Sequence, residues 1–565
     1  MKQGAISIPS SNARRAPSNG ETAPSGELIV QKVHDGVSSP DLDPSFVTHV
    51  VGDQSAVTSF FSDPLNHGLD PLKEQVQRID TVGSLIFLAG DKAYKVKRAV
   101  CFPYMDFSTL ARREEACRAE ILINRPTAPE IYIDVVAITR DGSGNIALNG
   151  SGEAIEWAVA MRRFDTSHTF DQLAEHGELT DSDLERATDA LISFCRRAPE
   201  RRAADWYADL SDYIERNDQG FHEAGGLFER EAVRTLSDRS LQHCARYQEL
   251  LTARGFAHKV RRCHGDLHLR NLVRLREGVR LFDAIEFDDR LATGDMLYDL
   301  AFLLMDFDRS GLRHEANTVL NHYLMRQIGS SDLEALAALP LFLSLRAAHQ
   351  ARVLGQQVTH LSGRARARVR DKARDYFNYA IDMLEPRDVF LTVIGGLSGT
   401  GKSTVARALA PSIGRSPGAI ILRSDVVRKR LLKVSLDTVL GDGDYGRELT
   451  QEVFETLNRL ARTALEAGHS VIVDGVFARE EERAAIENIA RMVDCRFASV
   501  WLEANVQTRL ERVDARLADE SDTNSDVAQQ QEMFDTSNIT WPRVSSEASL
   551  ESTLAKVRPL VDRLN

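Results

Sequence analysis

The chain has 565 residues, 43 % of them hydrophobic, and this length exceeds what a single core serves, so two or three domains are expected. Its formal net charge of −13 disfavours binding to nucleic acid, because phosphate backbones attract basic surfaces. The sequence contains no apolar run long enough to span a bilayer and no secretory signal pattern, which predicts a cytoplasmic protein that does not bind membranes.

The first 45 residues are rich in Ser, Pro, Gly and charge and show little periodicity, which predicts a disordered tail. Arg14 and Arg15 leave a mitochondrial-type presequence as an alternative. The six cysteines are scattered without paired spacing, so they are expected to be reduced thiols and not a disulfide framework or a zinc site.

Short strands are predicted between residues 46 and 160. Ser84–Ala89, a Gly-Asp turn and Lys92–Val96 have the pattern of a β-hairpin. Leu110–Arg125 has helical spacing, and Ile155–Met161 is typical of a strand. Helices are expected over 170–260, a strand–turn–strand region over 263–287, and long helices over 295–384.

The pattern changes at Glu385–Asp388, where Pro386 ends the preceding helix. Val389–Ile394 is a nearly continuous apolar run, which suits a buried parallel strand. Further strands at 419–422, 470–473 and 497–502 alternate with helices. Residues 385–565 are therefore expected to form an α/β domain with a parallel sheet.

A phosphate-binding loop is predicted at Gly396–Ser403, which fits G-x-x-x-x-G-K-[ST] between a strand and a helix at Thr404–Ala410. Glycines let backbone N–H groups surround phosphate oxygens, so ATP or a related triphosphate should bind here. Lys402 would lie near the outer phosphates and Ser403 would contact Mg²⁺. The expected ATP-binding residues are Gly396, Ser398, Gly399, Thr400, Gly401, Lys402, Ser403 and Thr404.

Charged side chains follow the later strands, whose carboxyl ends should line the ligand crevice. Asp425 would accept a proton from a substrate hydroxyl and Arg428 would clamp substrate or phosphate, with a helix N-cap as the alternative for Asp425. Asp474 would hold Mg²⁺ through water or touch substrate. Arg512 and Arg516, one turn apart, would neutralise the transferring phosphate or else lie on a solvated helix face.

Residues 389–550 resemble the small P-loop kinases that include gluconate kinase, the zeta-toxin group and the kinase half of polynucleotide kinase. The matching pieces are GLSGTGKST, the Asp425–Arg428 run, VIVDGVF and the Arg512–Arg516 run. The resemblance implies a P-loop kinase fold and use of ATP, and it leaves the acceptor open.

A second site is predicted at His264–Asn271, which has the H-x-D-x-x-x-x-N spacing of a kinase catalytic loop. Asp266 would orient and deprotonate the acceptor hydroxyl, and Asn271 would hold a metal ion. A short strand over Leu281–Asp283 is expected to end in the second metal-binding carboxylate, Asp283.

Upstream, Lys95 lies on the second strand of the predicted hairpin, where a phosphate-contacting lysine is expected. Lys97 has the same strand parity and is the alternative. Glu120, on the following helix, is the candidate ion-pair partner of this lysine. The order of these pieces along the chain, more than any one of them, indicates a kinase site.

Residues 46–384 resemble the aminoglycoside phosphotransferase and fructosamine kinase group, with HGDLHLRN the most specific match. The resemblance implies an α+β, protein-kinase-like fold of two lobes, and a bracing role for the buried Asp299. The chain departs from protein kinases in having only Thr81–Ser84 where a glycine-rich loop would stand. It also has Asp283-Ala-Ile-Glu286 in place of Asp-Phe-Gly, so Glu286 would add a metal contact.

The two-domain order is similar to that of bacterial proteins described as bifunctional aminoglycoside phosphotransferase and ATP-binding proteins. We interpret the chain as a tandem kinase that uses Mg²⁺-ATP on hydroxyls of small molecules, such as sugars, aminoglycoside-like or nucleoside-like compounds. The alternatives are an ATP-binding sensor with a degenerate kinase half and a P-loop ATPase half, or a nucleic-acid end kinase. The sequence leaves the two acceptors and the oligomeric state open.

Overall fold

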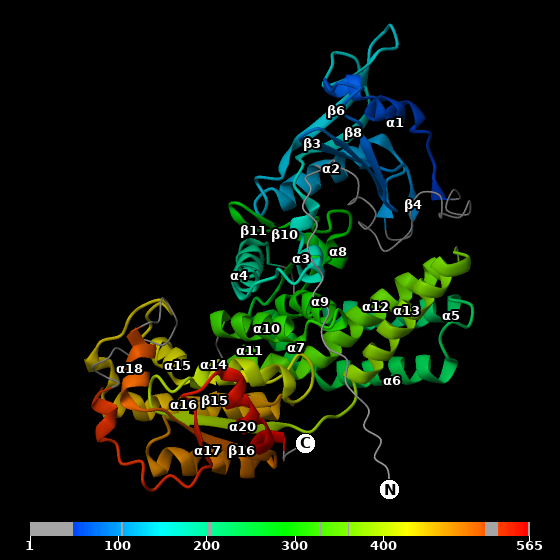
Figure 1. The fold of residues 1–565 in the computed structure, drawn as a ribbon. Coiled ribbons are helices and arrows are strands. Elements are labelled where there is room, and N and C mark those ends of the chain that lie inside the picture. The colour runs from blue at the N-terminus through cyan, green and yellow to red at the C-terminus, as the bar shows by residue number, and fades with distance from the viewer. Residues whose placement is uncertain are drawn as a thin grey trace, which may run out of the picture.

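The computed structural model describes residues 49–102, 105–200, 206–327, 330–359, 361–514 and 529–562. The tail predicted at 1–45 lies outside these residues. In Figure 1 a small sheet-containing lobe stands above a layer of helices, and a third body with its own sheet lies below and to the left of that layer. The chain therefore has a two-lobed N-terminal region followed by a C-terminal domain with its own sheet.

The small lobe is built on a six-stranded antiparallel sheet. Its strand order is β1 (Gln77–Asp80), β2 (Ser84–Ala89), β3 (Lys92–Lys97), β8 (Glu153–Arg162), β6 (Tyr132–Arg140) and β7 (Ile146–Leu148). The predicted hairpin is confirmed, with Ala89 facing Lys92 across the turn. Helix α1 (Ser55–Ser62) adds Phe61 to the core on one face, and α2 (Leu110–Asn124) packs against β8.

Helices form the larger lobe, as the sequence predicts. They are α3 (Phe170–Glu175), α4 (Asp181–Arg197), α5 (Trp206–Glu223), α6 (Arg230–Arg246), α7 (Gln248–Phe256), α9 (Met296–Arg309), α10 (Arg313–Gln327), α11 (Ser330–Ala335), α12 (Leu339–Val358) and α13 (Gly363–Met383). Between α7 and α9 the chain forms β9 (Val260–Arg262), β10 (Leu272–Leu275), β11 (Gly278–Leu281), α8 (Asp289–Ala292) and β12 (Thr293–Asp295). Short strands β4 (Cys101–Phe102) and β5 (Met105–Asp106) precede α2.

The C-terminal domain has a five-stranded sheet in which every pairing is parallel. The order is β14 (Ile420–Arg423), β15 (Val471–Asp474), β13 (Phe390–Gly396), β16 (Arg496–Glu503) and β17 (Arg543–Ser545). The connecting helices are α14 (Lys402–Leu409), α15 (Ser424–Leu431), α16 (Arg447–Glu466), α17 (Glu480–Val493), α18 (Val506–Asp514) and α20 (Leu550–Asp562). The predicted parallel α/β domain is confirmed, and only the three-residue edge strand β17 lacks a sequence signal.

The N-terminal region and the C-terminal domain contact each other along the edge strand β14 through both polar and apolar side chains. We call this interface the seam. Asn321 of α10 accepts a hydrogen bond from the Ile421 N–H at 2.7 Å and donates to the Ala419 carbonyl at 3.1 Å. Asn317, one turn earlier, donates to the same carbonyl at 3.1 Å. These amides satisfy an otherwise open sheet edge, and one hydrophobic cluster continues through both regions, so the regions are stabilised together.

Asn321→Ala should lower the stability of the full chain by about 1–3 kcal/mol, because it leaves the Ile421 N–H without its side-chain acceptor in a covered position. The melting temperature of the variant measures this. Asn488→Ala, on the exposed face of α17, is the matched control and should melt with the parent. Equal melting of both variants would show that α10 does not stabilise β14.

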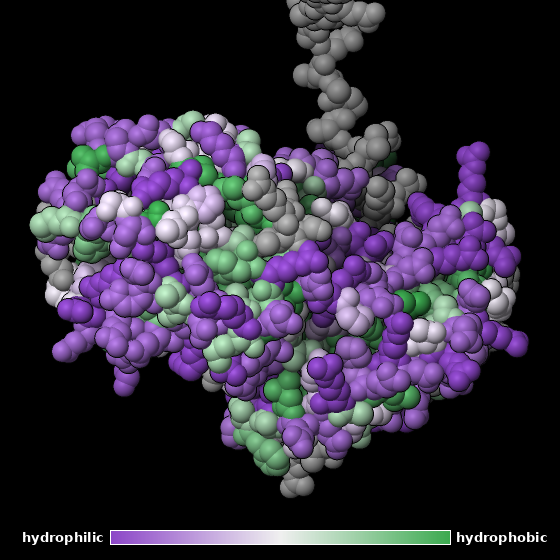
Figure 2. All heavy atoms as spheres, turned by 90° about the horizontal axis from the view of Figure 1, so that it is seen from below, coloured by the Kyte–Doolittle hydropathy of each residue, from purple (hydrophilic) through white to green (hydrophobic). Residues whose placement is uncertain are grey.

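The surface shown in Figure 2 is mainly hydrophilic, in keeping with the high content of charged residues in the sequence. Hydrophilic side chains cover most of the face seen from below in Figure 2, with apolar ones scattered between them. All six cysteines are free thiols, as predicted. Among the described residues, none of the helices combines the length and the apolar character needed to cross a bilayer.

Candidate active sites

A network of two lysines and three carboxylates, buried except for Asp283, joins the two lobes of the N-terminal region. Lys95 Nζ lies 2.9 Å from Glu120 Oε1 and 2.5 Å from Asp283 Oδ1. Lys97 Nζ lies 2.5 Å from the other Glu120 oxygen and also contacts Glu286. Both candidate lysines therefore bind Glu120, but only Lys95 is paired with Asp283, which makes it the better placed for a phosphate.

These contacts set the charge state of the network. Burial disfavours the charge of Lys95, but Asp283, Glu120 and Glu286 outweigh it and raise its pKa well above the ordinary value. Burial also works against ionisation of Asp283, yet Lys95 and Lys97 lower its pKa. Burial raises the pKa of Glu286 against the opposing effect of Lys97. Lys95 is thus held as a cation beside an ionised Asp283.

The fully buried carboxylate of Asp299 binds the backbone of the His264–Asn271 loop. Asp299, on α9, accepts hydrogen bonds at 2.9 Å from the backbone N–H groups of His264 and Gly265. Arg346 lies 3.6 Å from Asp299 and donates to the Gly265 carbonyl at 3.1 Å. This is the bracing position that the family resemblance implies for Asp299.

Asp266 lies at the floor of the cavity, next to His268 and Asn271. Its carboxylate is 3.3 Å from His268 Nε2, and the Asn271 amide donates to its backbone carbonyl at 2.9 Å. Burial would raise the pKa of Asp266, but His268 and His264 outweigh it and lower the pKa strongly. Asp266 is therefore ionised at neutral pH.

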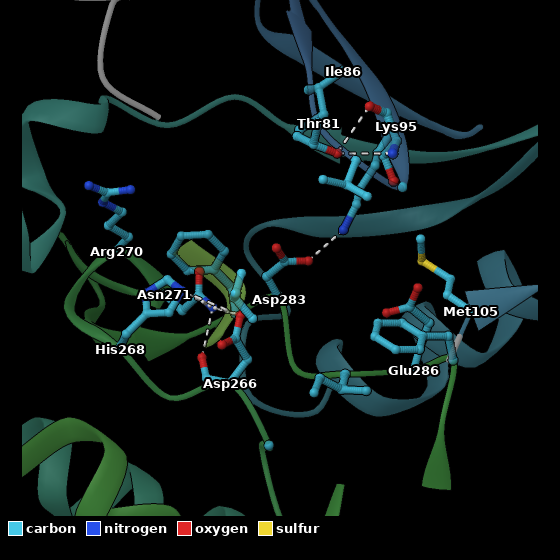
Figure 3. A pocket seen from close by; sticks show the side chains of 18 of the residues that line it. Thr81, Ile86, Lys95, Met105, Asp266, His268, Arg270, Asn271, Asp283 and Glu286 are labelled. Atoms are coloured by element: carbon cyan, nitrogen blue, oxygen red, sulfur yellow. Dashed lines mark hydrogen bonds and ion pairs between the residues drawn. The ribbon is translucent and has the colours of Figure 1, made fainter. Parts of the chain in front are cut away.

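The sequence prediction of a strand over Leu281–Asp283 is wrong at its end, because β11 stops at Leu281. Asp283 has φ 62°, a left-handed conformation that extended strands exclude. Its N–H donates to the Tyr132 hydroxyl at 3.1 Å. The turn directs the carboxylate toward Lys95, so Asp283 stands between Lys95 and the Asp266–Asn271 loop in Figure 3.

A cavity of about 2570 Å³ separates the two lobes, and its lining includes Lys95, Lys97, Glu120, Asp266, Asn271, Asp283 and Glu286. Its roof includes the Thr81–Ser84 turn, which is closed by hydrogen bonds of 2.9 and 3.0 Å between Thr81 Oγ1 and Ser84. This turn occupies the place that a glycine-rich loop would take. The volume exceeds that of an ordinary small-ligand pocket and leaves room for a nucleotide together with an acceptor.

The second site is the loop between β13 and α14, where glycines are required by close backbone contacts. A Cβ at Gly396 would stand 2.6 Å from the Leu502 carbonyl oxygen, and one at Gly399 would stand 2.5 Å from the Arg509 carbonyl oxygen. Both glycines, like Gly401, have positive φ. The loop then enters α14 at Lys402, with the helix N-terminus directed at the loop.

Side chains of this loop contact the end of the neighbouring strand. Ser403 Oγ donates to Asp474 Oδ2 at 2.5 Å, and Arg423 Nε lies 3.7 Å from the same carboxylate. Lys402 Nζ donates to the Leu397 carbonyl at 3.2 Å, folded back over the loop. Ser403 and Asp474, 71 residues apart, are thus brought together as the two predicted metal contacts.

Asp425 lies in the first turn of α15, directly after the carboxyl end of β14, and Arg428 lies in the last turn of the same helix. The helix begins after Arg423 without a side-chain cap, so Asp425 is not its N-cap. Arg428 is buried, lies 4.7 Å from the Tyr445 ring centre and donates to the Asp444 carbonyl at 3.0 Å. Burial lowers the pKa of Arg428, against the opposing effect of Asp425.

Of the two predicted arginines on the later helix, one is described. Arg512 donates to the Ser546 carbonyl at 2.7 Å and approaches the Gly399 carbonyl at 3.5 Å, so it lies beside the phosphate loop. Arg516 lies outside the described residues, because α18 is followed by the gap at 515–528. Thr400, within the loop, donates a hydrogen bond to the Leu397 carbonyl, and Thr404, which follows the loop, is exposed on α14.

Sequence reasoning missed several side chains that contact the phosphate loop, and two of them bind Ser398. Gln531 accepts a hydrogen bond from the Ser398 N–H at 2.7 Å, and Arg509 donates to the Ser398 carbonyl at 2.8 Å. They come from positions 133 and 111 residues away, and neither belongs to a local motif. The sequence could have indicated Arg509, because this residue lies one turn before Arg512 on the same helix.

Comparison with known proteins matches both regions. Residues 135–339 match the model of the phosphotransferase enzyme family, and residues 391–536 match a family described as an AAA domain. An uncharacterized protein of Mycobacterium tuberculosis is 28 % identical over 463 residues, which cover 80 % of this chain and 88 % of that protein.

Two solved structures are similar to parts of this chain. Choline kinase from Cryptosporidium parvum is 11 % identical and covers 59 % of this chain and 95 % of its own, with a TM-score of 0.37. A gluconokinase from Sinorhizobium meliloti is 20 % identical and covers 31 % of this chain and 91 % of its own, with a TM-score of 0.22.

Proposed function

We propose that this chain, an ATP-dependent phosphotransferase with two kinase-type domains, phosphorylates hydroxyl groups of small molecules at two separate sites, one in each domain. The observation that carries the proposal is the cavity in which an ionised Asp266 faces the Lys95–Glu120–Asp283 network. The phosphate loop with Ser403 and Asp474 supports the second site.

At the N-terminal site, Lys95 would hold the ATP phosphates, positioned by its ion pair with Glu120. Asp266 would accept a hydrogen bond from the acceptor hydroxyl, aim its oxygen at the γ-phosphorus, and take its proton as the new P–O bond forms. His268 next to Asp266 keeps the carboxylate ionised between turnovers. Because phosphoryl transfer depends mainly on positioning and charge, this small set is sufficient.

The donor atoms at this site fit Mg²⁺. Asp283 offers a carboxylate whose pKa is lowered, and Asn271 offers an amide, and oxygen ligands of this kind are what Mg²⁺ prefers. The Asp283 side chain is 45 % exposed, so it is open to the cavity although it is paired with Lys95. When bound, the ion would neutralise charge on the ATP phosphates; Glu286, paired with Lys97, would be at most an outer contact.

Asp283→Ala should weaken the Mg²⁺-dependent part of ATP binding by about 10–100-fold, because one carboxylate is lost from the ion. The measurement is calorimetric titration of the full-length chain with a non-hydrolysable ATP analogue, in a Lys402→Ala background that weakens nucleotide binding at the other site. Asp371→Ala, an exposed carboxylate on α13, is the control. Binding that is equally Mg²⁺-dependent in both variants would contradict the metal assignment.

At the C-terminal site, Lys402 and the loop N–H groups would hold the β- and γ-phosphates, and Arg512 would stabilise charge on the transferring group. Ser403 Oγ and Asp474 provide adjacent oxygens for Mg²⁺, Asp474 directly or through water. Asp425 would accept the acceptor proton and Arg428 would position the acceptor. Arg516 is assigned the same charge-stabilising role as Arg512 from the sequence alone.

A screen of the full-length chain against sugars, polyols, nucleosides and aminoglycosides tests the proposal, with mass spectrometry to identify phosphorylated products. Point variants that silence one site at a time assign each product to its domain. Isolated halves are unsuitable, because β14 is covered by α10 and the core cluster continues across the seam. Turnover of ATP without any phosphorylated product would favour an ATPase over a kinase.

A further inference from the structure

We propose that the acceptor of the N-terminal site carries an anionic group, a phosphate or a carboxylate, next to the hydroxyl that reacts, and that Arg352 and Arg216 bind this group. The inference rests on the proposed function, because it names the acceptor class of that site. It predicts that cationic acceptors such as choline or an aminoglycoside are poor substrates.

The relevant wall of the cavity is formed by α5 and α12. These helices contribute the basic residues Arg216, Arg346 and Arg352 and the imidazole of His349, together with one acidic residue, Glu223. The same wall reaches the Asp266 loop, since Arg346 donates a hydrogen bond at 3.1 Å to the carbonyl of Gly265, the residue before Asp266. An acceptor that offers its hydroxyl to Asp266 therefore extends along this wall.

Arg352 is held in a fixed direction. Its Nε donates to Asn217 Oδ1 at 3.2 Å, and its NH2 group lies 3.2 Å from His349 Nδ1, so it links α5 to α12. A Cβ at Gly220 would lie 2.5 Å from Arg352 Cγ and Cδ. The glycine therefore makes the space through which the arginine side chain crosses, and the guanidinium is pre-positioned at low entropy cost.

The neighbouring charges on the wall leave it positive. Burial, with Arg352 and Arg346, lowers the pKa of His349 to about 3, so this imidazole is neutral and offers hydrogen bonds without charge. Arg346 is engaged by Asp299 and the Gly265 carbonyl. Arg216 is exposed, with its guanidinium carbon 5.7 Å from the Tyr213 ring centre.

Several acidic side chains elsewhere in the cavity are paired with other cations. Asp283 and Glu286 pair with the two lysines, and Asp171 lies 3.7 Å from Arg270. On the cavity wall formed by α5 and α12, which we call the acceptor wall, the Glu223 carboxylate accepts a hydrogen bond from the Gln219 amide at 2.8 Å. A cationic acceptor would meet the arginines, whereas planar guanidinium groups match carboxylate and phosphate oxygens with two parallel hydrogen bonds.

The test uses the full-length chain with Lys402→Ala, so that the phosphate loop is silent. Matched acceptors are compared with Mg²⁺-ATP: glycerol against glycerol 3-phosphate, glucose against gluconate and glucose 6-phosphate, and choline and kanamycin as cations. We expect transfer to be confined to the anionic members. Better transfer to choline, kanamycin or the neutral members would overturn the proposal.

Four variants locate the anion. Arg352→Gln and Arg216→Gln should each raise KM for the anionic acceptor about 10–100-fold, the factor expected for losing a charge-assisted hydrogen bond, with a smaller change in kcat. Arg352→Lys should recover part of the affinity. Gly220→Ala should raise KM through displacement of Arg352 while the melting temperature is kept or raised, since alanine favours the helix. Arg368→Gln, exposed on α13, should change nothing.

If none of these compounds is phosphorylated, titration with inorganic phosphate decides the matter in the same Lys402→Ala background. Phosphate binding that is lost in Arg352→Gln and kept in Arg368→Gln supports the anion site, and binding equal in both variants overturns it. Failure of the proposed function has a different signature. In that case Mg²⁺-ATP does not bind to the N-terminal site, while phosphate binding still depends on Arg352.

Discussion

Asp266→Asn in the full-length chain is expected to reduce phosphoryl transfer at the N-terminal site by about 10²–10⁴-fold, the usual effect of removing a general base. The affinity for ATP should stay near that of the parent, because Lys95, Glu120 and Asp283 are unchanged. The asparagine keeps the shape of the side chain, and the loop remains braced by Asp299. The rate of transfer to an acceptor found in the screen measures the effect.

The control for this variant is Asp288→Asn, which removes another carboxylate that lines the cavity, in this case one that caps α8. It should leave the transfer rate within a few-fold of the parent, since the Asp288 carboxylate accepts hydrogen bonds from the Arg290 and Leu291 N–H groups at the start of α8. Equal losses in both variants would mean that the charge of the cavity, and not a base at Asp266, controls the rate.

Lys402→Ala is expected to reduce nucleotide turnover at the C-terminal site by about 10²–10³-fold, comparable to the loss of one preorganised charge donor in other enzymes. The lysine provides the formal positive charge of the phosphate loop itself, and the backbone N–H groups alone cannot replace it. Nucleotide binding should weaken as well. Lys556→Ala, exposed on α20, is the matched control and should behave as the parent.

Asp425→Asn separates binding from chemistry at the same site. It should keep nucleotide affinity near the parent's while transfer falls about 10²–10⁴-fold, because Asp425 lies on α15 and not in the phosphate loop. A parallel loss of nucleotide affinity would instead place Asp425 among the nucleotide or metal contacts.

The parts of the sites that lie in one stretch of sequence could be predicted. The phosphate loop follows from glycines that its own backbone turns require, and the His264–Asn271 loop follows from its spacing. The choice between Lys95 and Lys97 could not be made, because residues two apart on a strand share a face and both reach Glu120. Only the long-range pairing of Lys95 with Asp283 distinguishes them.

What the sequence could not show is set by contacts between distant segments. The acceptor wall depends on Arg352 meeting Asn217 and Gly220, which are more than a hundred residues earlier and belong to no motif. The seam at β14 depends on Asn321, which in the sequence is an ordinary polar helix residue. Helical periodicity predicts that α5, α10 and α12 exist, but it does not say which faces meet.

The central claim is that two independent phosphotransferase sites coexist in one chain. The most direct measurement compares the phosphorylated products of Asp266→Asn and Asp425→Asn full-length proteins on one acceptor panel, with ATP affinity verified for each. Two separate sites predict that each variant loses a different product and keeps the other at the parental rate. Loss of the same product in both variants would contradict the claim, because it would leave a single catalytic site or two obligatorily coupled ones.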